Sequence, residues 1–460
     1  MRGEGGAPHV QIQRAVGVKQ AADARKNRQP SGTLKWKRIM SSFDERYDKV
    51  LVLSRALAAN QDRMVKAAVS DLHFTVKDSA NEVAVAVGRL KMYEEADFLR
   101  HRIPLGGAGS RVCLMLSYNG SAWLNTAITS LYMVGNKVTV KFASKGRRIM
   151  ALTRELYEPV FGSDISFYFG HGKDFVDEAL KATEVSAVVV FGFDENIMPY
   201  EEAFRRAGKK LVFEGPGQDP FIVFPDANLD LAMADLMAAK FMYSGQTCTA
   251  PKRIFIHESI YEKFLDRFVE SVRHLVVGDP ADPKTDVAAV ISDIAVERIR
   301  LQLANAREKG AQVLVGGSIQ GNLILPTVVR DCTDDMLGMQ EEVFGPVAFT
   351  SSFRTREEVV ARAKDHKYGL RAAVFGGIEA CQAAQALLGE PYCHPVPDYV
   401  FGKFGTVAYN KPRSESWQGA FVTRAIGGYG YSGWIWETVD GEFRIKQGPK
   451  LLSTETSVPA

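Results

Sequence analysis

Residues 111–142 read RVCLMLSYNGSAWLNTAITSLYMVGNKVTVKF. Two short apolar runs, Val112–Leu116 and Val138–Phe142, flank the stretch Ser121–Val134, which is long enough for a helix. A strand, a helical crossover and a second strand are typical of a parallel pair, because parallel strands need a long connection. The segment therefore predicts a parallel sheet that is covered by helices.

Similar runs continue along the chain. Three more short apolar segments lie at Ile165–Phe169, Val185–Phe191 and Leu211–Phe213, and a second stretch of helical length lies at Arg147–Val160. Buried strands that alternate with helices are typical of a doubly wound α/β fold. Because such sheets bind ligands at the carboxyl ends of their strands, we expect the loops after Phe142 and Phe191 to lie near a cofactor.

The flanking regions differ in pattern. The first hundred residues are helical in character, with Val50, Leu53 and Leu57 at helical spacing. Glycine and proline cluster in EGPGQDP at residues 214–220, which indicates a domain boundary. A second strand–helix series follows, with a strand at Arg253–Ile256, a helix at Tyr261–Leu275 and later strands at Gln312–Val315, Val347–Phe353, Ala372–Phe375 and Thr406–Tyr409.

The composition excludes some classes of partner. The 460 residues carry a net charge of +3, too small to indicate nucleic acid or a membrane, and no apolar stretch approaches the length of a membrane-spanning helix. The basic residues 1–38 are expected to form a solvated terminus, although a transit peptide fits in part. Five widely spread cysteines indicate neither a disulfide framework nor a zinc site. We therefore expect no metal and a reducing, cytoplasmic environment.

Cys248 is the cysteine in the most distinctive setting. It stands between two threonines, after Ser244-Gly245-Gln246 and directly before an expected strand, which favours a turn. A turn exposes a thiol to backbone N–H groups that lower its pKa and stabilise an oxyanion. The residues alone leave two interpretations open, a nucleophile or a small buried hydrophobic residue.

Several segments occur in the order known from one family. The segment GQTCTAPKRIFIHESIYEKF (245–264) resembles the catalytic-cysteine segment of the aldehyde dehydrogenase superfamily. Three further motifs are similar to the family's base motif, its Glu-Glu-x-Phe-Gly-Pro element and its closing Gly-Gly-Tyr run, namely FEGPGQDPFIVFPDANLDLA (213–232), EEVFGPV (341–347) and GGYGYSGW (427–434). Linking segments at 277–292, 325–329 and 367–375 agree, so the resemblance covers about residues 40–450.

The resemblance implies an aldehyde dehydrogenase-like α/β fold. It comprises a doubly wound parallel-sheet nucleotide domain, an α/β catalytic domain and a small oligomerisation element. We expect the dinucleotide-binding domain, with its N-terminal helices, at residues 1–215 and the catalytic domain at residues 216–425. The C-terminal segment at residues 426–460 is expected to complete the oligomerisation element.

The resemblance also implies the site residues. Cys248 matches the nucleophile, and Glu214, 34 positions earlier, matches the general base. Asn119 matches the asparagine of the oxyanion hole. Three more residues match positions that bind the cofactor: Lys141 at the adenosine ribose, and Glu342 and Phe344 at the nicotinamide ribose and ring.

The implied reaction is oxidation of a small aldehyde to a carboxylic acid with NAD or NADP. Cys248 forms a thiohemiacetal, hydride passes to the nicotinamide, and water activated by Glu214 hydrolyses the thioester. One alternative is acylating chemistry with coenzyme A, although members of that kind generally lack the glutamate base. A second alternative is a non-catalytic scaffold with a degenerate cofactor site.

The sequence departs from the family at the expected pyrophosphate site. Members usually carry Phe-Thr-Gly-Ser there, and the serine starts a helix whose N-terminus binds the pyrophosphate. This chain has Gly192 at the glycine and Phe193 in place of the serine, followed by Asp194 and Glu195. Two carboxylates near a pyrophosphate repel it unless they point away. This departure is the strongest support for the scaffold alternative.

A second departure concerns the choice of cofactor. NAD-preferring members often place a glutamate three residues after the lysine, and here the residue is Ser144. Loss of that carboxylate removes repulsion of a 2′-phosphate, and Lys145, Arg147 and Arg148 follow. We therefore expect NADP to be favoured over NAD.

Other departures affect the substrate tunnel and the assembly. Gly215 and Pro216 alter the hinge beside the base, while Gly120 and Ile426 replace larger residues and predict a differently shaped aldehyde pocket. The family's N-terminal hairpin is expected to be missing, whereas a C-terminal strand at Phe443–Lys446 is retained. We therefore expect a homodimer.

Overall fold

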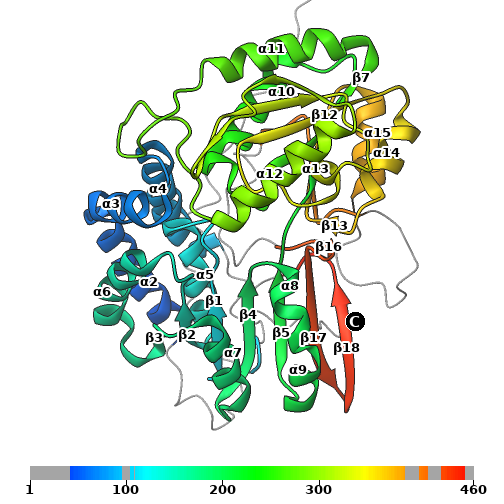
Figure 1. The fold of residues 1–460 in the computed structure, drawn as a ribbon. Helices are drawn as coiled ribbons and strands as arrows, with labels where there is room; N and C mark the ends of the chain where they lie inside the picture. Colours follow the sequence, from blue (N-terminus) through cyan, green and yellow to red (C-terminus); the bar gives the residue numbers. More distant parts are fainter. Residues whose placement is uncertain (1–41, 96–103, 108, 389–402, 413–425, 451–460) are drawn as a thin grey trace, which may run out of the picture. The chain divides into compact units, whose positions relative to one another are not determined.

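The computed structural model describes residues 42–95, 104–107, 109–388, 403–412 and 426–450 (Figure 1). The basic segment 1–38 lies outside the described residues, and the stretch where the hairpin was expected to be missing lies only partly within them.

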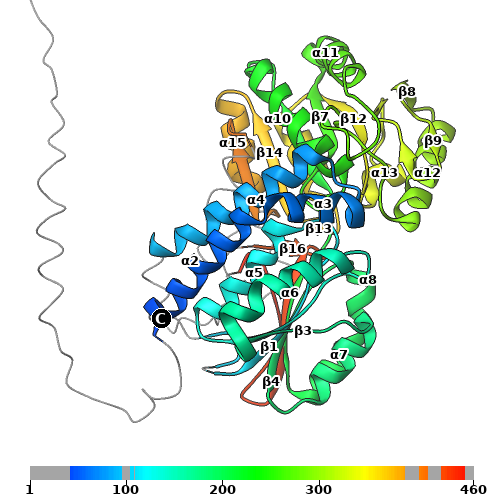
Figure 2. The same cartoon turned by 90° about the vertical axis from the view of Figure 1, so that its left-hand side faces the viewer.

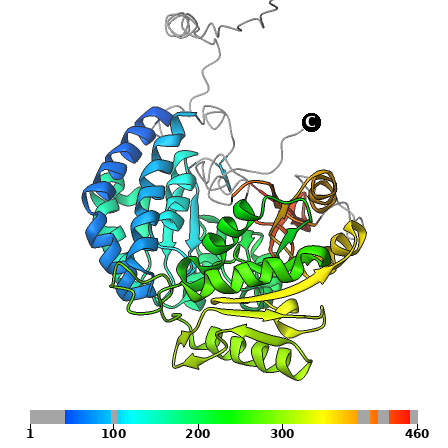
Figure 3. The same cartoon turned by 90° about the horizontal axis from the view of Figure 1, so that it is seen from above.

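Three N-terminal helices form one layer. Helix α2 (Phe43–Ala59) begins at a capping box formed by Ser42 and Glu45, and α3 (Gln61–Leu72) and α4 (Val76–Lys91) follow closely. Figure 3 shows the blue helices lying side by side. Val50, Leu53 and Leu57 are fully buried, which confirms the helical prediction for this region.

The first sheet is doubly wound. Its order is β18-β17-β5-β4-β1-β2-β3, and five strands are parallel: β1 (Arg111–Met115), β2 (Lys137–Lys141), β3 (Ile165–Phe167), β4 (Val185–Phe191) and β5 (Lys210–Glu214). Helices α5 (Ala122–Met133) and α6 (Arg147–Phe161) share one core with the N-terminal helices. Helices α7 (Gly172–Lys181) and α9 (Glu201–Ala207) cover the opposite face.

The C-terminal strands extend this first sheet. Strand β17 (Gly433–Val439) pairs antiparallel with β5, and β18 (Glu442–Gln447) pairs with β17 at the sheet edge (Figure 1). The strand expected at Phe443–Lys446 is β18, whereas β17 was not predicted. The pairing places Gly433 opposite Glu214, so the closing motif lies against the end of β5.

The second sheet has the order β15-β14-β6-β7-β12-β11-β8. Its strands are β6 (Asp219–Val223), β7 (Pro251–His257), β8 (Gln312–Val315), β11 (Thr327–Arg330), β12 (Val347–Phe353), β14 (Arg371–Phe375) and β15 (Thr406–Tyr409). All neighbours are parallel except β8 with β11. One face packs on α10 (Leu229–Phe241) and α11 (Tyr261–Arg273). The other face packs on α12 (Asp293–Glu308), α13 (Leu337–Gln340), α14 (Arg356–Lys364) and α15 (Ile378–Leu387).

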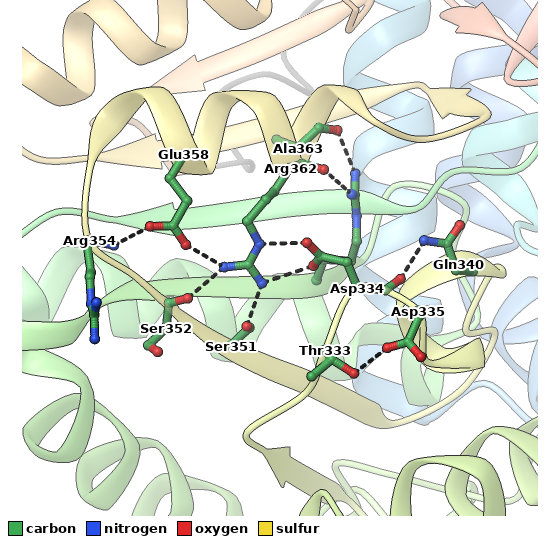
Figure 4. Close-up of polar contacts among 11 residues, drawn as sticks. Thr333, Asp334, Asp335, Gln340, Ser351, Ser352, Arg354, Glu358, Arg362 and Ala363 are labelled. Carbon is green, nitrogen blue, oxygen red and sulfur yellow. Dashed lines mark hydrogen bonds and ion pairs between the residues drawn. The ribbon is translucent and has the colours of Figure 1, made fainter. Parts of the chain in front are cut away.

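An arginine in α14 ties this sheet to the segment that leads into the EEVFGPV motif (Figure 4). The Arg362 guanidinium donates two hydrogen bonds to Asp334, at 2.7 and 2.9 Å, and others to the Ser351 hydroxyl and the Ser352 carbonyl. Gln340 donates to the Asp334 carbonyl at 2.5 Å. The loop before α13 is thereby fixed to β12 and α14, and Glu342 and Phe344 follow this helix directly.

Candidate active site

Two pockets meet at one point of the structure. The strand-end pocket lies at the carboxyl ends of β1, β2, β4 and β5, and the helix-side pocket is lined by α4 and α5. Four residues line both pockets: Asn119, Phe191, Glu214 and Cys248. The structure therefore brings the three predicted catalytic residues together, although they lie far apart in the sequence.

The five other predicted residues line the strand-end pocket: Lys141, Ser144, Gly192, Glu342 and Phe344. The loops that follow Phe142 and Phe191 face this same pocket, as expected from the parallel topology.

A strained turn precedes Cys248. Tyr243 and Ser244 have φ values of 52° and 56°, in the left-handed region that non-glycine residues rarely adopt, and Gly245 follows at 75°. The Tyr243 N–H donates to the Asp78 carboxylate at 2.9 Å, and the Ser244 hydroxyl accepts from the Ala288 N–H at 2.9 Å. These contacts from distant segments hold the turn in its conformation.

The backbone at Cys248 is supported by a buried lysine. The Lys252 ammonium donates to the carbonyls of Thr247, at 2.9 Å, and Cys248, at 2.5 Å. Gly217 of the base motif approaches the same carbonyl so closely that a Cβ there would lie 2.4 Å from the Cys248 oxygen. Only glycine fits this position, because any side chain would push the base motif away from the loop that carries Cys248 (residues 242–250, the cysteine loop).

The thiol itself differs from expectation. Burial is the largest cause that raises the Cys248 pKa well above its ordinary value, and the Glu214 carboxylate adds to the effect, whereas Lys252 opposes it. The sequence predicted a lowered pKa from backbone N–H donors, and that prediction is wrong for this structure. Desolvation and the nearby carboxylates of Glu214 and Glu342 disfavour the thiolate, and Lys252 only partly offsets them.

Glu214 ends β5 opposite Phe191 of β4. Burial raises the pKa of this carboxyl to about 8; Lys450 lowers it, while Glu342 raises it further. The hinge that follows is fixed by Ser432, whose hydroxyl donates to the Pro216 carbonyl at 2.5 Å and whose carbonyl accepts from the Gly215 N–H at 3.1 Å. The closing motif thus positions a carboxyl whose pKa suits a general base at neutral to alkaline pH.

Asn119 lies in the loop between β1 and α5. The Ser117 hydroxyl donates a hydrogen bond to its Oδ1 atom. This contact orients the side-chain amide and leaves its NH₂ group as the donor for an oxygen in the pocket.

Glu342 and Phe344 each contact other residues of the site. The Glu342 carboxylate lies 3.7 Å from the Lys252 ammonium and accepts from the Gly217 N–H at 3.3 Å. The Phe344 ring makes edge contacts with Tyr118 and Phe193, at centroid distances of 5.6 and 6.2 Å. The EEVFGPV element therefore supplies a carboxylate and an aromatic wall to the strand-end pocket.

The strand-end pocket suits a dinucleotide. Lys141 is buried, its ammonium donates to the Phe142 carbonyl at 3.0 Å, and burial lowers its pKa. Ser144 is exposed at the rim, and a Cβ built at Gly192 would meet open space. A cation at one end, an open stretch at Gly192 and aromatic rings beside Cys248 fit a ribose, a pyrophosphate and a nicotinamide in that order.

The carboxylates at the expected pyrophosphate site turn away from it. Asp194 begins α8 (Asp194–Ile197), is buried and accepts a hydrogen bond from the Tyr368 hydroxyl at 3.2 Å. Glu195 is ion-paired with Arg298 at 2.5 Å. Neither carboxylate lines the strand-end pocket, whereas Phe193 does. The sequence predicted that these carboxylates would repel a pyrophosphate unless they pointed away, and both side chains do point away.

Sequence reasoning missed several residues at the site. The helix-side pocket contains Glu82, Arg89 and Arg371, which are buried. Lys252 lies near Cys248, and Lys450 lies near Glu214. A carboxylate such as Glu82 within the buried stripe of α4 was a signal from which a functional residue could have been predicted.

The helices in the described part of the chain lack the length and apolar character needed to cross a membrane.

Comparison with known proteins gives a consistent result. A model of the aldehyde dehydrogenase family matches residues 8–388. The chain is 40% identical over 179 residues to 2-aminomuconic semialdehyde dehydrogenase of Bos taurus, covering 37% of each protein. It is 36% identical over 214 residues to mitochondrial succinate-semialdehyde dehydrogenase of Oryza sativa subsp. japonica, covering 46% of this chain and 41% of that protein. These alignments span less than half of the relatives' own length.

Solved structures show the same fold. An oxidoreductase from Marinobacter aquaeolei superposes with a TM-score of 0.77 at 22% identity, covering 90% of this chain and 87% of the other. Betaine aldehyde dehydrogenase from Staphylococcus aureus, in complex with NAD+, superposes with a TM-score of 0.75 at 22% identity, covering 88% and 83%. At this identity the likeness confirms the predicted α/β architecture.

Proposed function

The chain belongs to the aldehyde dehydrogenase family, and on that premise we propose that it oxidises an aldehyde to a carboxylic acid with a nicotinamide cofactor, through Cys248. The observation that carries the proposal is the meeting of the two pockets at Cys248, Glu214 and Asn119. One pocket admits an aldehyde and the other a dinucleotide, and both reach the thiol.

The first step needs a thiolate. Because the Cys248 pKa is raised, a base must take the thiol proton, and Glu214 borders both pockets beside it. The thiolate attacks the aldehyde carbon and forms the thiohemiacetal. The developing oxyanion receives hydrogen bonds from the Asn119 amide and the Cys248 N–H.

A bound nicotinamide would accept the hydride that the thiohemiacetal carbon loses as the thioester forms on Cys248. Lys141, Ser144, Glu342 and Phe344 are the residues that would hold it. The last step is hydrolysis of the thioester, in which Glu214 acts as the base. Glu214 first releases the thiol proton to solvent and then takes a proton from water. The hydroxide attacks the thioester carbon, and the acid leaves as the sulfur recovers that proton from Glu214.

The helix-side pocket favours a particular class of aldehyde. Arg89 and Arg371 line it together with apolar side chains. Guanidinium groups bind carboxylates through paired hydrogen bonds. We therefore expect an aldehyde that carries a carboxylate to be oxidised more efficiently than a neutral aldehyde of the same length.

One experiment tests the proposed function. Purified protein is mixed with NAD or NADP and a panel of charged and neutral aldehydes, and the absorbance of the reduced cofactor is followed. We expect turnover that the Cys248→Ala variant loses and that Cys381→Ala, at another partly exposed cysteine, retains. Absence of turnover together with absence of cofactor binding by calorimetry contradicts the proposal, and turnover only with added coenzyme A favours the acylating alternative.

A further inference from the structure

Glu82 is a fully buried carboxylate of α4 that borders the helix-side pocket. Its first set of contacts lies at the start of α5, two residues after Asn119. The Ser121 N–H donates to both of its oxygens, at 3.1 and 2.9 Å, the Ser121 hydroxyl donates to Oε2, and the Ala122 N–H donates to Oε2 at 3.2 Å. Glu82 therefore caps the N-terminus of α5 from α4. Figure 2 shows α4 and α5 in the same part of the molecule.

Its second contact lies on the cysteine loop. The Tyr243 hydroxyl lies close enough to the Glu82 carboxyl to lower its pKa, and both residues line the helix-side pocket. Tyr243 is the first residue of the strained turn, and Asp78, one helical turn before Glu82, accepts its backbone N–H. The ring of Tyr243 is further stacked on Phe74 at 4.4 Å. Helix α4 thus holds the backbone of the turn before Cys248 through Asp78, and Phe74, two residues before α4, packs against the Tyr243 side chain.

Burial is the largest influence on Glu82 and raises its pKa to about 8, while the N–H donors of Ser121 and Ala122 and the Tyr243 hydroxyl lower it. A buried carboxyl group of this kind is costly unless its partners are fixed. Its hydrogen bonds reach the start of α5, next to the Asn119 loop, and the pocket that it lines is also lined by Tyr243 and Cys248. A cap of α5 alone could be supplied by a local serine or aspartate, without a carboxylate from α4.

We propose that Glu82 is a positioning residue that sets the distance between the Asn119 amide and Cys248 by holding both of their loops. This inference rests on the proposed function, because its effect is on the oxyanion formed at Cys248. Glu82 itself makes no contact with reacting atoms in the scheme. Loss of it lets the two loops move independently, and displacements of about 1 Å cost about a hundredfold in rate.

The test is a double-mutant cycle. Asn119→Ala is expected to lower kcat by about 100- to 1000-fold, and Glu82→Ala by about 10- to 100-fold. If Glu82 acts through Asn119, the Glu82→Ala change costs less than about threefold in the Asn119→Ala background. Glu82→Gln keeps one acceptor oxygen and is expected to lose less activity than Glu82→Ala.

A matched control exists on the adjacent helix. Asp71 of α3 caps α6 in the same manner, accepting from the N–H groups of Arg148 and Ile149 at 2.6 and 3.1 Å. Asp71→Ala removes a comparable inter-helix cap outside the catalytic residues, so its kcat is expected to stay within about twofold of the parent. If Asp71→Ala and Glu82→Ala lower kcat equally, Glu82 acts only as a stabilising helix cap, and the inference is overturned.

Amide hydrogen exchange gives a readout that does not need turnover. Glu82→Ala is expected to speed exchange in both 119–125 and 242–248, whereas Asp71→Ala leaves both unchanged. Additive losses in the cycle, or faster exchange in 119–125 alone, overturn the positioning role while wild-type activity upholds the proposed function. An inactive wild type contradicts the proposed function, and the exchange pattern then still decides whether Glu82 couples the loops.

Discussion

The carboxylate of Glu195 is ion-paired with the guanidinium of Arg298 at 2.5 Å, and the same guanidinium lies over the ring of Phe193, 5.1 Å from its centroid. Phe193 lines the strand-end pocket, so Arg298 holds the acidic side chain off the pocket and supports the ring that faces it. A segment that departs from the family at sequence level is thereby compatible with an anionic ligand.

Arg298→Ala is expected to weaken cofactor binding. The change frees the Glu195 charge beside the pocket, and an exposed charge at this range is worth about 0.4–1 kcal/mol, or about a two- to fivefold higher Kd. Calorimetric titration with NAD and NADP measures the effect. Arg300→Ala on the same helix removes an exposed arginine paired with Glu297 at 3.4 Å, and it is expected to leave the Kd unchanged. Equal Kd values for all three proteins contradict the role given to Arg298.

The orientation of these carboxylates shows where sequence reasoning stops. The strand Val185–Phe191 was predicted with its bounds, because a run buried on both faces is encoded locally. The partners of Asp194 and Glu195 lie more than 100 residues away, at Tyr368 and Arg298, and no local pattern specifies them.

The same distinction holds at the proposed catalytic residues. Motif order identified Cys248, Glu214 and Asn119, and the structure brings all three to one point. The pKa of Cys248 was predicted in the wrong direction, because it depends on burial and on Glu214 from another strand. Glu82 was missed because it acts on Ser121, 39 residues away, and on Tyr243, still further along the chain.

Turnover is expected to rise with pH. Glu214 acts as a carboxylate and its pKa is raised to about 8, so it is mostly protonated at pH 7 and mostly ionised at pH 9. The ionised fraction grows by about tenfold over this interval, and the raised Cys248 pKa acts in the same direction. Steady-state rates between pH 6 and 10 measure the profile. The Glu214→Gln variant is expected to lose about 100-fold or more in kcat. A wild-type profile that falls from pH 7 to pH 9 contradicts this assignment.

Lys450→Met is expected to move that profile to higher pH. The Lys450 ammonium lowers the Glu214 pKa, and it lies where Cβ atoms on Gly427 and Gly433 would come within 3.0 and 2.9 Å of its nitrogen. Without the Lys450 charge, Glu214 is harder to ionise, so activity falls at pH 7 and recovers at alkaline pH. Lys446→Met removes a lysine that pairs with Glu437 instead, and its midpoint is expected to stay in place. A shift to lower pH, or equal shifts in both variants, contradicts the electrostatic influence of Lys450 on Glu214.

Arg362→Ala is expected to destabilise the protein. The substitution removes two bonds to Asp334 and the contacts with Ser351 and Ser352, at a cost of about 2–4 kcal/mol. A lower midpoint of thermal unfolding measures this loss. Arg354, whose side chain is 78% exposed and paired with Glu258, provides the control, and Arg354→Ala is expected to change the midpoint little. Equal midpoints for both variants contradict the importance of the network in Figure 4.

Ser144→Glu is expected to shift cofactor preference from NADP toward NAD. Ser144 is exposed at the rim of the strand-end pocket that also contains Lys141, so a glutamate there faces the region of the adenosine ribose. Its carboxylate accepts hydrogen bonds from ribose hydroxyls and repels a 2′-phosphate, and about 1.4 kcal/mol of discrimination corresponds to a tenfold change in the kcat/KM ratio. Ser144→Gln adds the same bulk without the charge, so it separates electrostatics from steric effects. An unchanged ratio in Ser144→Glu, or the same shift in Ser144→Gln, contradicts a role for charge at this position in choosing the cofactor.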